Sequence, residues 1–283
     1  MASNFLPFFL PSSHGALYGL YLPHTSTEVR GTLLWLPPFA EEANCARRHI
    51  VAAARECQAQ GYASLLIDPF GTGESDGELV DASWDIWRSN IVEAASWLRA
   101  KQPGPLWLAG VRAGVLLAAD VVSDVMPAGM VCWQPVSSGR AVLDSFLRMK
   151  LASEWALGEA TKAMDILGKL REQLAAGASV EVAGYELSAS MAAALAARTL
   201  SWAQQACERV ACVEFRTHGE TPSALQHTPA MARLCDGLSA AGMRVASLVC
   251  EAPAFWQAHE AVLTPRLGVK TATLLKGLRG VSA

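Results

Sequence analysis

The sequence predicts an α/β protein with a mostly parallel central sheet, helices flanking both faces, and an inserted helical cap. Three observations lead to this prediction. Strands alternate with helices along most of the chain, which is typical of a parallel sheet covered on both faces. The segment Tyr62-Ala-Ser-Leu-Leu-Ile67 is a continuous apolar run, as expected of a central strand. The alternation stops between about residues 140 and 205, where helical patterns dominate.

The first half of the chain supplies most of the predicted sheet. Gly61 follows the first helical pattern and is a natural helix C-cap, and Pro103-Gly104 stops the second helix. Strands are predicted at 15–21, 30–36, 62–67, 105–109 and 129–133, and helices at 43–60, 84–101 and 113–125.

The second half contains the predicted cap and then the rest of the sheet. We expect a core formed by residues 1–139 and 206–283, with a cap of residues 140–205 inserted into it. In the cap, helices are predicted at 142–151, 159–175 and 188–207, interrupted only by the strand-like segment 179–183. Beyond the cap, strands are predicted at 211–215 and 244–249, and helices at 222–241 and 264–280.

The composition excludes several classes of protein. The 283 residues are 52% hydrophobic and 17% charged, which favours a large buried core over disorder. The formal net charge of -3, without any Lys/Arg-rich block, gives no indication of a nucleic-acid partner. The seven Cys form no C-x-x-C pair and the six His show no ligand spacing with them, so we expect reduced thiols, no metal site and no cofactor.

The chain also lacks the patterns of membrane insertion and export. The segment 1–10 is apolar, but it has no basic start and is interrupted by Pro7, with Pro11 directly after it, so it makes a poor secretory signal. No run reaches the roughly 18 apolar residues that a spanning helix requires. We therefore expect a cytoplasmic protein without a membrane span; its oligomeric state does not follow from the sequence.

The turn Gly110-Val-Arg-Ala-Gly114 lies between a predicted strand and a predicted helix. This is the strand, sharp turn and helix of the G-x-S-x-G nucleophile elbow, with Arg112 where the serine belongs. A guanidinium stays protonated at neutral pH and has no electron pair with which to attack a carbonyl. The alternative interpretation is an ordinary strand-to-helix loop rich in small residues.

The segment Leu36-Pro-Pro-Phe-Ala-Glu-Glu42 follows an early strand. In a fold with such an elbow, the loop here donates one backbone N–H to the oxyanion hole, and the residue after the nucleophile donates the other. The expected donors are Phe39 or Ala40, and Ala113. The same segment also reads as a Pro-rich turn before an acidic helix N-terminus, where Glu41 and Glu42 favour the helix dipole.

The segment Asp68-Pro-Phe-Gly-Thr-Gly-Glu-Ser-Asp76 follows the central strand. It lacks the third Gly of a dinucleotide fingerprint and the Lys of a P-loop, so nucleotide binding is not indicated. Its Gly residues permit a tight turn, and we interpret the segment as structural.

The partners of a nucleophile are expected after the last two strands, the acid first and then the histidine. Glu220 is the candidate acid, with a surface-loop carboxylate as the alternative. His259 is the candidate histidine, but it comes late, after Phe255 and Trp256, which favours the alternative of a lone exposed histidine at the start of a helix. Ser138, beside Ser137 after the strand 129–133, is the candidate for a displaced nucleophile; the alternative is a polar loop at a strand end.

Together these motifs resemble the α/β-hydrolase superfamily over nearly the whole chain, and more narrowly the second of two hydrolase families associated with the exosortase A system. Those genes accompany bacterial exopolysaccharide production and protein sorting. The resemblance implies an ester or acyl hydrolase. The narrower resemblance is carried by Pro37–Glu42 with Asn44, Arg47 and Arg48, by Asp68–Ser75, by Gly110–Gly114, by Trp133–Val136 with Gly139, by Phe146–Arg148, by Ala183–Ser188, and by Pro253 with Phe255–Gln257.

Arg112 leaves three functions open. A guanidinium at the start of a helix needs an anionic partner, because burying it alone would cost several kcal/mol. Glu41 or Glu42 could supply that partner internally, or a small anionic or acyl ligand could bind under the cap. The chain would then be a hydrolase with a displaced nucleophile, a non-catalytic binding protein, or a scaffold for a partner protein.

Overall fold

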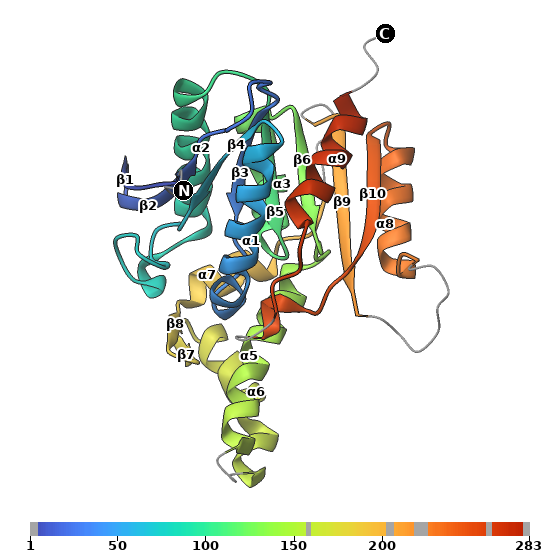
Figure 1. Ribbon diagram of the computed structural model, residues 1–283. Coiled ribbons are helices and arrows are strands. Elements are labelled where there is room, and N and C mark those ends of the chain that lie inside the picture. Colours follow the sequence, from blue (N-terminus) through green and yellow to red (C-terminus); the bar gives the residue numbers. More distant parts are fainter. Residues whose placement is uncertain (1–4, 157–159, 202–206, 218–225, 259–261, 280–283) are drawn as a thin grey trace.

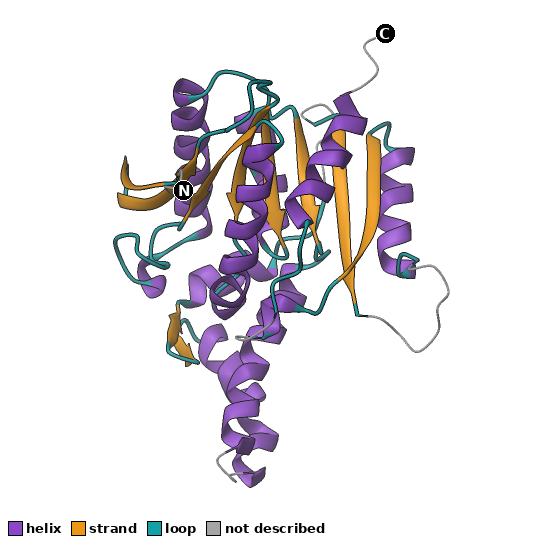
Figure 2. Cartoon of the chain, in the orientation of Figure 1, coloured by secondary structure: helices purple, strands orange, loops and turns teal. Residues whose placement is uncertain are grey.

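The computed structural model describes the backbone of residues 5–156, 160–201, 207–217, 226–258 and 262–279, and side chains within these ranges except 153–165. Its centre is an eight-stranded sheet that is parallel except for its second strand, which pairs antiparallel with both of its neighbours (Figures 1 and 2). The strands run in the order β1 (Leu6–Ser12), β2 (Gly15–Leu22), β4 (Tyr62–Ile67), β3 (Gly31–Leu36), β5 (Leu106–Val111), β6 (Gly129–Trp133), β9 (Arg209–Arg216) and β10 (Arg244–Glu251).

The central strands are apolar on both faces because helices cover both faces. Every residue of β3, β4, β5 and β6 is buried. Side chains of a strand alternate between faces, so Leu34 and Leu36 join one hydrophobic cluster while Leu33 and Trp35 join the other. One cluster lies under α2 (Trp84–Lys101), α3 (Gly114–Asp120) and α8 (Pro229–Ala240), and the other under α1 (Glu41–Ala59) and α9 (Leu267–Arg279).

Local signals explain where several helices begin. The Ser83 hydroxyl accepts a hydrogen bond from the Ile86 N–H at 3.2 Å and caps α2. Thr228 caps α8 in the same way through the Met231 N–H at 3.3 Å, and Pro229 follows in the first turn, where its missing N–H costs nothing. The short helix α4 (Val122–Val125) continues from α3.

A segment between β6 and β9 lies beyond the carboxyl ends of the strands (Figure 1). It comprises α5 (Gly139–Ala156), α6 (Ala160–Ala175), the hairpin β7 (Val180–Val182) and β8 (Tyr185–Leu187), and α7 (Ala189–Ala196). This is the position at which the sequence predicts a helical cap; the division of the chain into core and cap domains stays a prediction.

The structure corrects three sequence-based expectations. The predicted helix 188–207 ends at Ala196, and Thr199 instead forms a bridge with Ser138. Strand β8 was not predicted. It follows the turn at Gly184 and forms a short hairpin with β7, within a region whose sequence pattern is mostly helical. Strand β1 was also missed, since its exposed Leu6 and Phe9 obscure the alternation that marks an edge strand.

Two further expectations, on the thiols and on membrane spans, can be compared with the described residues. All seven Cys lie among them and are free thiols. Within the described ranges, no helix is both long and apolar enough to cross a membrane.

Candidate functional site

The turn between β5 and α3 holds its central residue in a left-handed conformation. Arg112 has φ 53, and its N–H donates to the Trp133 carbonyl at 2.9 Å. The flanking glycines allow the close approach that the turn requires: a Cβ on Gly110 would lie 2.6 Å from the Val115 Cα, and one on Gly114 would lie 2.3 Å from the Leu36 carbonyl oxygen. The turn therefore has the strained geometry of an elbow, with its central side chain at the carboxyl edge of the sheet.

The Arg112 guanidinium is held by a carboxylate and an aromatic ring. Its Nε and Nη2 donate to the two carboxylate oxygens of Glu42, at 3.2 and 2.9 Å, which is a forked ion pair. The guanidinium carbon also lies 5.1 Å from the centre of the Trp256 ring. The Arg112 and Glu42 side chains are 17% and 18% exposed, so the pair is shielded from most of the solvent. Of the two predicted internal partners, the structure pairs Arg112 with Glu42.

Trp256 is fixed by an aromatic cluster on the face covered by α1 and α9. It lies in the short helix η2 (Phe255–Gln257) after β10, with its ring centre 5.2 Å from that of Phe255. Phe255 is fully buried, packs edge-on against Phe215, and stacks on His49 with ring centres 4.3 Å apart. These contacts hold the Trp256 ring in place next to the Arg112 side chain.

The loop before α1 adopts a strained conformation next to the elbow. Ala40, the N-cap of α1, has φ 49 and ψ -125, a conformation that favours glycine. Within the described part of the chain, neither the Ala40 nor the Ala113 N–H has a protein acceptor. Ala113 and Ala40, the latter one of two alternatives for the first expected oxyanion-hole donor, thus retain unused donors.

A cavity of about 320 Å³ lies between the first turn of α1, α5 and η2. Its volume is in the range of small-molecule sites. Its only charged lining residues among those described are Glu41 and Glu42. It is lined by Phe39, Glu41, Glu42, Cys45, Val142, Ser145, Phe146, Met149, Trp256 and Gln257.

The hairpin of the inserted segment contacts Glu41, one of the cavity's lining residues, through Tyr185. The Tyr185 hydroxyl donates to Glu41 Oε2 at 2.9 Å and accepts from Asn44 Nδ2 at 2.7 Å. Burial and the hydrogen bond to Glu41 raise the pKa of Tyr185, so the phenol stays protonated and remains a donor. Burial and the carboxylates of Glu41 and Glu42 likewise raise the pKa of the Cys45 thiol.

The predicted site residues have different positions. Phe39, Glu41 and Glu42 line the cavity, while Ala40 and Ala113 cap the helices on either side of the elbow. Ser138 lies at the start of α5, where its backbone pairs with Thr199. No contact of its hydroxyl with a histidine is present among the described residues. Glu220 and His259 lie outside the described residues.

Sequence reasoning missed two members of the site. Trp256 was noted as preceding the candidate histidine and as part of the narrower resemblance, but no contact with Arg112 was predicted for it. Tyr185 was assigned no role, because its partner Glu41 is 144 residues away along the chain. No described group of three or more His, Cys, Asp or Glu side chains is placed to hold a metal ion.

Comparison with known proteins supports the fold. No protein-family model and no curated protein matches the chain. Solved structures do match at low identity. XC6422 from Xanthomonas campestris, described as an a/b serine hydrolase without lid, is 14% identical with a TM-score of 0.56, covering 100% of this chain and 98% of its own.

Two further structures agree. Est1E from Butyrivibrio proteoclasticus, solved with ferulic acid, is 14% identical with a TM-score of 0.59 over 96% of this chain and 98% of its own. A thermostable carboxyl esterase from Bacillus coagulans is 10% identical with a TM-score of 0.60 over 98% of each chain. At such identities the similarity establishes architecture and not activity. The chain has the α/β-hydrolase fold.

Proposed function

We propose that this chain is a binding protein built on a hydrolase fold, and that its elbow does not hydrolyse esters. The observation that carries the proposal is the forked ion pair between Arg112 and Glu42, at the position where this fold normally keeps its nucleophile. A protonated guanidinium cannot attack a carbonyl, and here it is paired with a carboxylate and lies over an indole ring.

The cavity next to the ion pair is the proposed binding site. Its walls are mostly apolar, with Phe39, Phe146 and Trp256 among them, which suits an acyl or other apolar group. The ion pair neutralises Glu42, and the Asn44 and Tyr185 side chains are among the partners of Glu41. Both charged side chains that line the cavity among the described residues are carboxylates, which favours a ligand with a neutral or cationic head over the anionic ligand that Arg112 alone suggests.

The sequence resemblance adds a biological setting to the proposal. Several residues of the exosortase-associated pattern, including Phe39, Glu41, Glu42 and Trp256, line this cavity. We infer that the ligand is an intermediate with an apolar part that arises in exopolysaccharide production. An ester or acyl hydrolase with a diverted mechanism is the second candidate, supported by the unused N–H donors of Ala40 and Ala113.

A series of ligands that differ only in charge tests the binding proposal. Hexanol, hexylammonium and hexanoate have the same apolar chain, and we expect the first two to raise the melting temperature more than hexanoate does. Ser145→Phe, which places a ring in the cavity, should abolish the effect; Ser96→Phe, on the exposed side of α2 and outside the cavity, should not. Stronger stabilisation by hexanoate would contradict the proposed charge preference, and no stabilisation by any of the three would contradict the site.

The catalytic half of the proposal is tested by restoring a hydroxyl at the elbow. We expect Arg112→Ser to hydrolyse p-nitrophenyl butyrate no faster than the natural chain, because the described neighbours of residue 112 are a carboxylate and an indole and not an imidazole. Steady-state release of p-nitrophenolate is the measurement. A gain of tenfold or more would show that a working base survives beside the elbow, and the proposal would then be wrong.

A further inference from the structure

A carboxylate is buried in the apolar strand β9, away from the elbow. Glu214 is 1% exposed and lies between the buried apolar residues Val213 and Phe215 of its strand. It accepts hydrogen bonds from the Thr228 N–H at 3.0 Å and from the Thr228 hydroxyl at 2.5 Å. These two bonds satisfy part of the buried charge and fix the start of α8 against the sheet.

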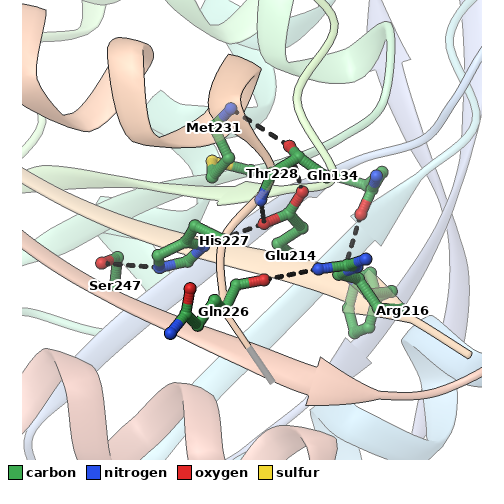
Figure 3. Close-up of polar contacts among 9 residues, drawn as sticks. Gln134, Glu214, Arg216, Gln226, His227, Thr228, Met231 and Ser247 are labelled. Atoms are coloured by element: carbon green, nitrogen blue, oxygen red, sulfur yellow. Dashed lines mark hydrogen bonds and ion pairs between the residues drawn. The ribbon is translucent and has the colours of Figure 1, made fainter. Parts of the chain in front are cut away.

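The same carboxylate orients a histidine that contacts a serine (Figure 3). His227 Nδ1 lies 2.9 Å from Glu214 Oε2, and His227 Nε2 lies 3.0 Å from the Ser247 hydroxyl on β10. With the ring proton on Nδ1, the imidazole donates to Glu214 and accepts from Ser247. The chain of acid, imidazole and hydroxyl has the order of hydrogen bonds that activates a serine nucleophile.

The surroundings hold the imidazole and leave the hydroxyl open to solvent. His227 immediately precedes the capping Thr228, and Arg216 Nη1 donates to the Gln226 carbonyl at 2.7 Å, which fixes the residue before it. Ser247 is exposed, while His227 retains 23% of its side-chain exposure. A small reagent can therefore reach the Ser247 oxygen.

The backbone of Ser247 supplies a hydrogen-bond donor beside its own hydroxyl. Strand β10 is the last strand of the sheet, and the N–H groups of Arg244 and Ala252 donate to the neighbouring segment of the chain. In a strand the N–H direction alternates, so even-numbered residues donate inward and the Ser247 N–H points to the open edge. Such an N–H next to the attacking oxygen can stabilise a developing oxyanion.

We propose that Glu214, His227 and Ser247 form a second site, at the edge of the sheet, which accepts acyl groups from small, uncharged carboxylic esters. This goes beyond the proposed function, because it uses neither Arg112 nor the cavity under α5. Ser247 is the nucleophile, His227 is the general base, and Glu214 is a positioning residue that holds the imidazole tautomer.

The reaction that this geometry supports is an ordinary acyl transfer to water. The Ser247 oxygen bonds to the ester carbonyl carbon while its proton passes to His227 Nε2. The carbon–oxygen bond to the alcohol then breaks, and the alcohol leaves with that proton. Water attacks the acyl-serine with the same base, which releases the carboxylic acid and restores the Ser247 hydroxyl.

A purely structural role would leave part of this arrangement unexplained. Capping of α8 requires only Thr228, which contacts both Glu214 and the Met231 N–H. The link from His227 to an exposed hydroxyl adds nothing to that cap. The nearby Cys235 is a poor alternative nucleophile, since its hydrogen bond with Cys212 and burial raise the pKa of its thiol and keep it protonated.

A fluorophosphonate probe tests the site, because it labels serines that have an activating base. We expect the natural chain to be labelled at Ser247, as identified by peptide mass spectrometry. Labelling should be lost in Ser247→Ala, and its rate should fall by about 100-fold in His227→Gln. Ser239→Ala removes another exposed serine, on α8, and should label at the natural rate. Absence of labelling, or labelling at any other residue, would overturn the proposal.

The role of Glu214 has its own readout. Glu214→Gln can donate its amide N–H to the imidazole and so favour the wrong tautomer, as well as losing the charge. For p-nitrophenyl acetate we expect kcat to fall about 100-fold with KM unchanged, in a variant whose urea unfolding still shows a cooperative transition. An unchanged kcat would contradict the proposal, and so would a fall in kcat that disappears when only the folded fraction is counted.

Discussion

Arg112 combines two features that are costly on their own and compatible together. A non-glycine residue at φ 53 stores backbone strain, and a guanidinium that is 17% exposed has lost much of its hydration. The left-handed turn directs the side chain to Glu42 and Trp256, whose contacts offset the lost hydration. The identity of this single residue therefore couples the elbow to α1 and to the segment after β10.

A double-mutant cycle measures this coupling at the residue scale. We expect Arg112→Met alone to lower the free energy of unfolding by about 2–3 kcal/mol, because the Glu42 carboxylate is left without its charged donor. The double variant with Glu42→Gln should be less destabilised than the two single effects summed, by about 1–2 kcal/mol. Urea unfolding at neutral pH gives the four values. Simple additivity would mean that the ion pair contributes no coupling energy.

At the scale of elements, the elbow depends on how closely β3 and α3 approach. The Gly114 Cα faces the Leu36 and Pro37 carbonyl oxygens, and an added Cβ would lie 2.3 and 2.6 Å from them. Neither oxygen can move without disturbing a strand of the sheet or the loop before α1. This contact is the physical reason for the small residues of the turn.

Two glycine-to-alanine substitutions separate this contact from the general effect of glycine in helices. We expect Gly114→Ala to lower the free energy of unfolding by about 2–3 kcal/mol, since the extra methyl group collides with backbone atoms. Gly237→Ala, within α8 and with open space around its Cβ, should instead raise stability by about 0.5–1 kcal/mol. Thermal and urea unfolding of the two variants provide the comparison. Equal effects would show that the close approach at Gly114 is not limiting.

The element scale also shows what the sequence could and could not predict. Helix α2 lies at 84–101 as predicted, because a capping serine and a Pro-Gly stop define both of its ends. Helix α7 ends eleven residues early relative to 188–207, since alanine-rich sequence has helix propensity whether or not packing supports a helix. Local signals therefore determined most element positions, and packing determined the exceptions.

The sites were less predictable than the elements. Glu42 was anticipated as one of the possible partners of Arg112, beside Glu41 and a ligand, because both residues belong to motifs at the same sheet edge. Glu214, His227 and Ser247 were not anticipated, although a glutamate within the apolar run 209–215 is a signal that a buried charge needs partners. Their partners come from another strand and a helix cap, and only the tertiary structure brings those together.

At the scale of the whole molecule, the two proposed sites lie at different parts of the sheet. The cavity and the ion pair lie at the carboxyl ends of the central strands, next to α5, where this fold positions its ligands. The hydrogen-bonded residues Glu214, His227 and Ser247 lie elsewhere. Glu214 and Ser247 are on the last two strands, and His227 directly precedes α8 (Figure 3). The proposed binding site and the proposed acyl-accepting site can therefore be altered independently.

The buried thiols make a prediction about the stability of the whole molecule at alkaline pH. Burial raises the pKa of Cys57 and of Cys207, and the hydrogen bond with Cys132 raises that of Cys212 well above the usual thiol range. In the unfolded chain these thiols lose their protons near pH 9, whereas the folded protein retains them. The unfolded state then binds fewer protons than the folded state. The free energy of unfolding therefore has its full value below about pH 8 and falls as the pH rises further.

Urea unfolding between pH 7 and pH 10, under reducing conditions, measures this dependence. We expect each retained thiol proton to contribute a slope of about 1.4 kcal/mol per pH unit above the unfolded pKa. Cys57→Ala combined with Cys207→Ala should lower stability at pH 7, because cavities form, but should flatten the alkaline slope by about two such contributions. Cys250→Ala is the matched single-thiol control, because this buried thiol contacts the Lys270 ammonium, and the slope should keep the contributions of Cys57 and Cys207. An alkaline slope that is the same in the natural chain and in the double variant would mean that these thiols do not control it.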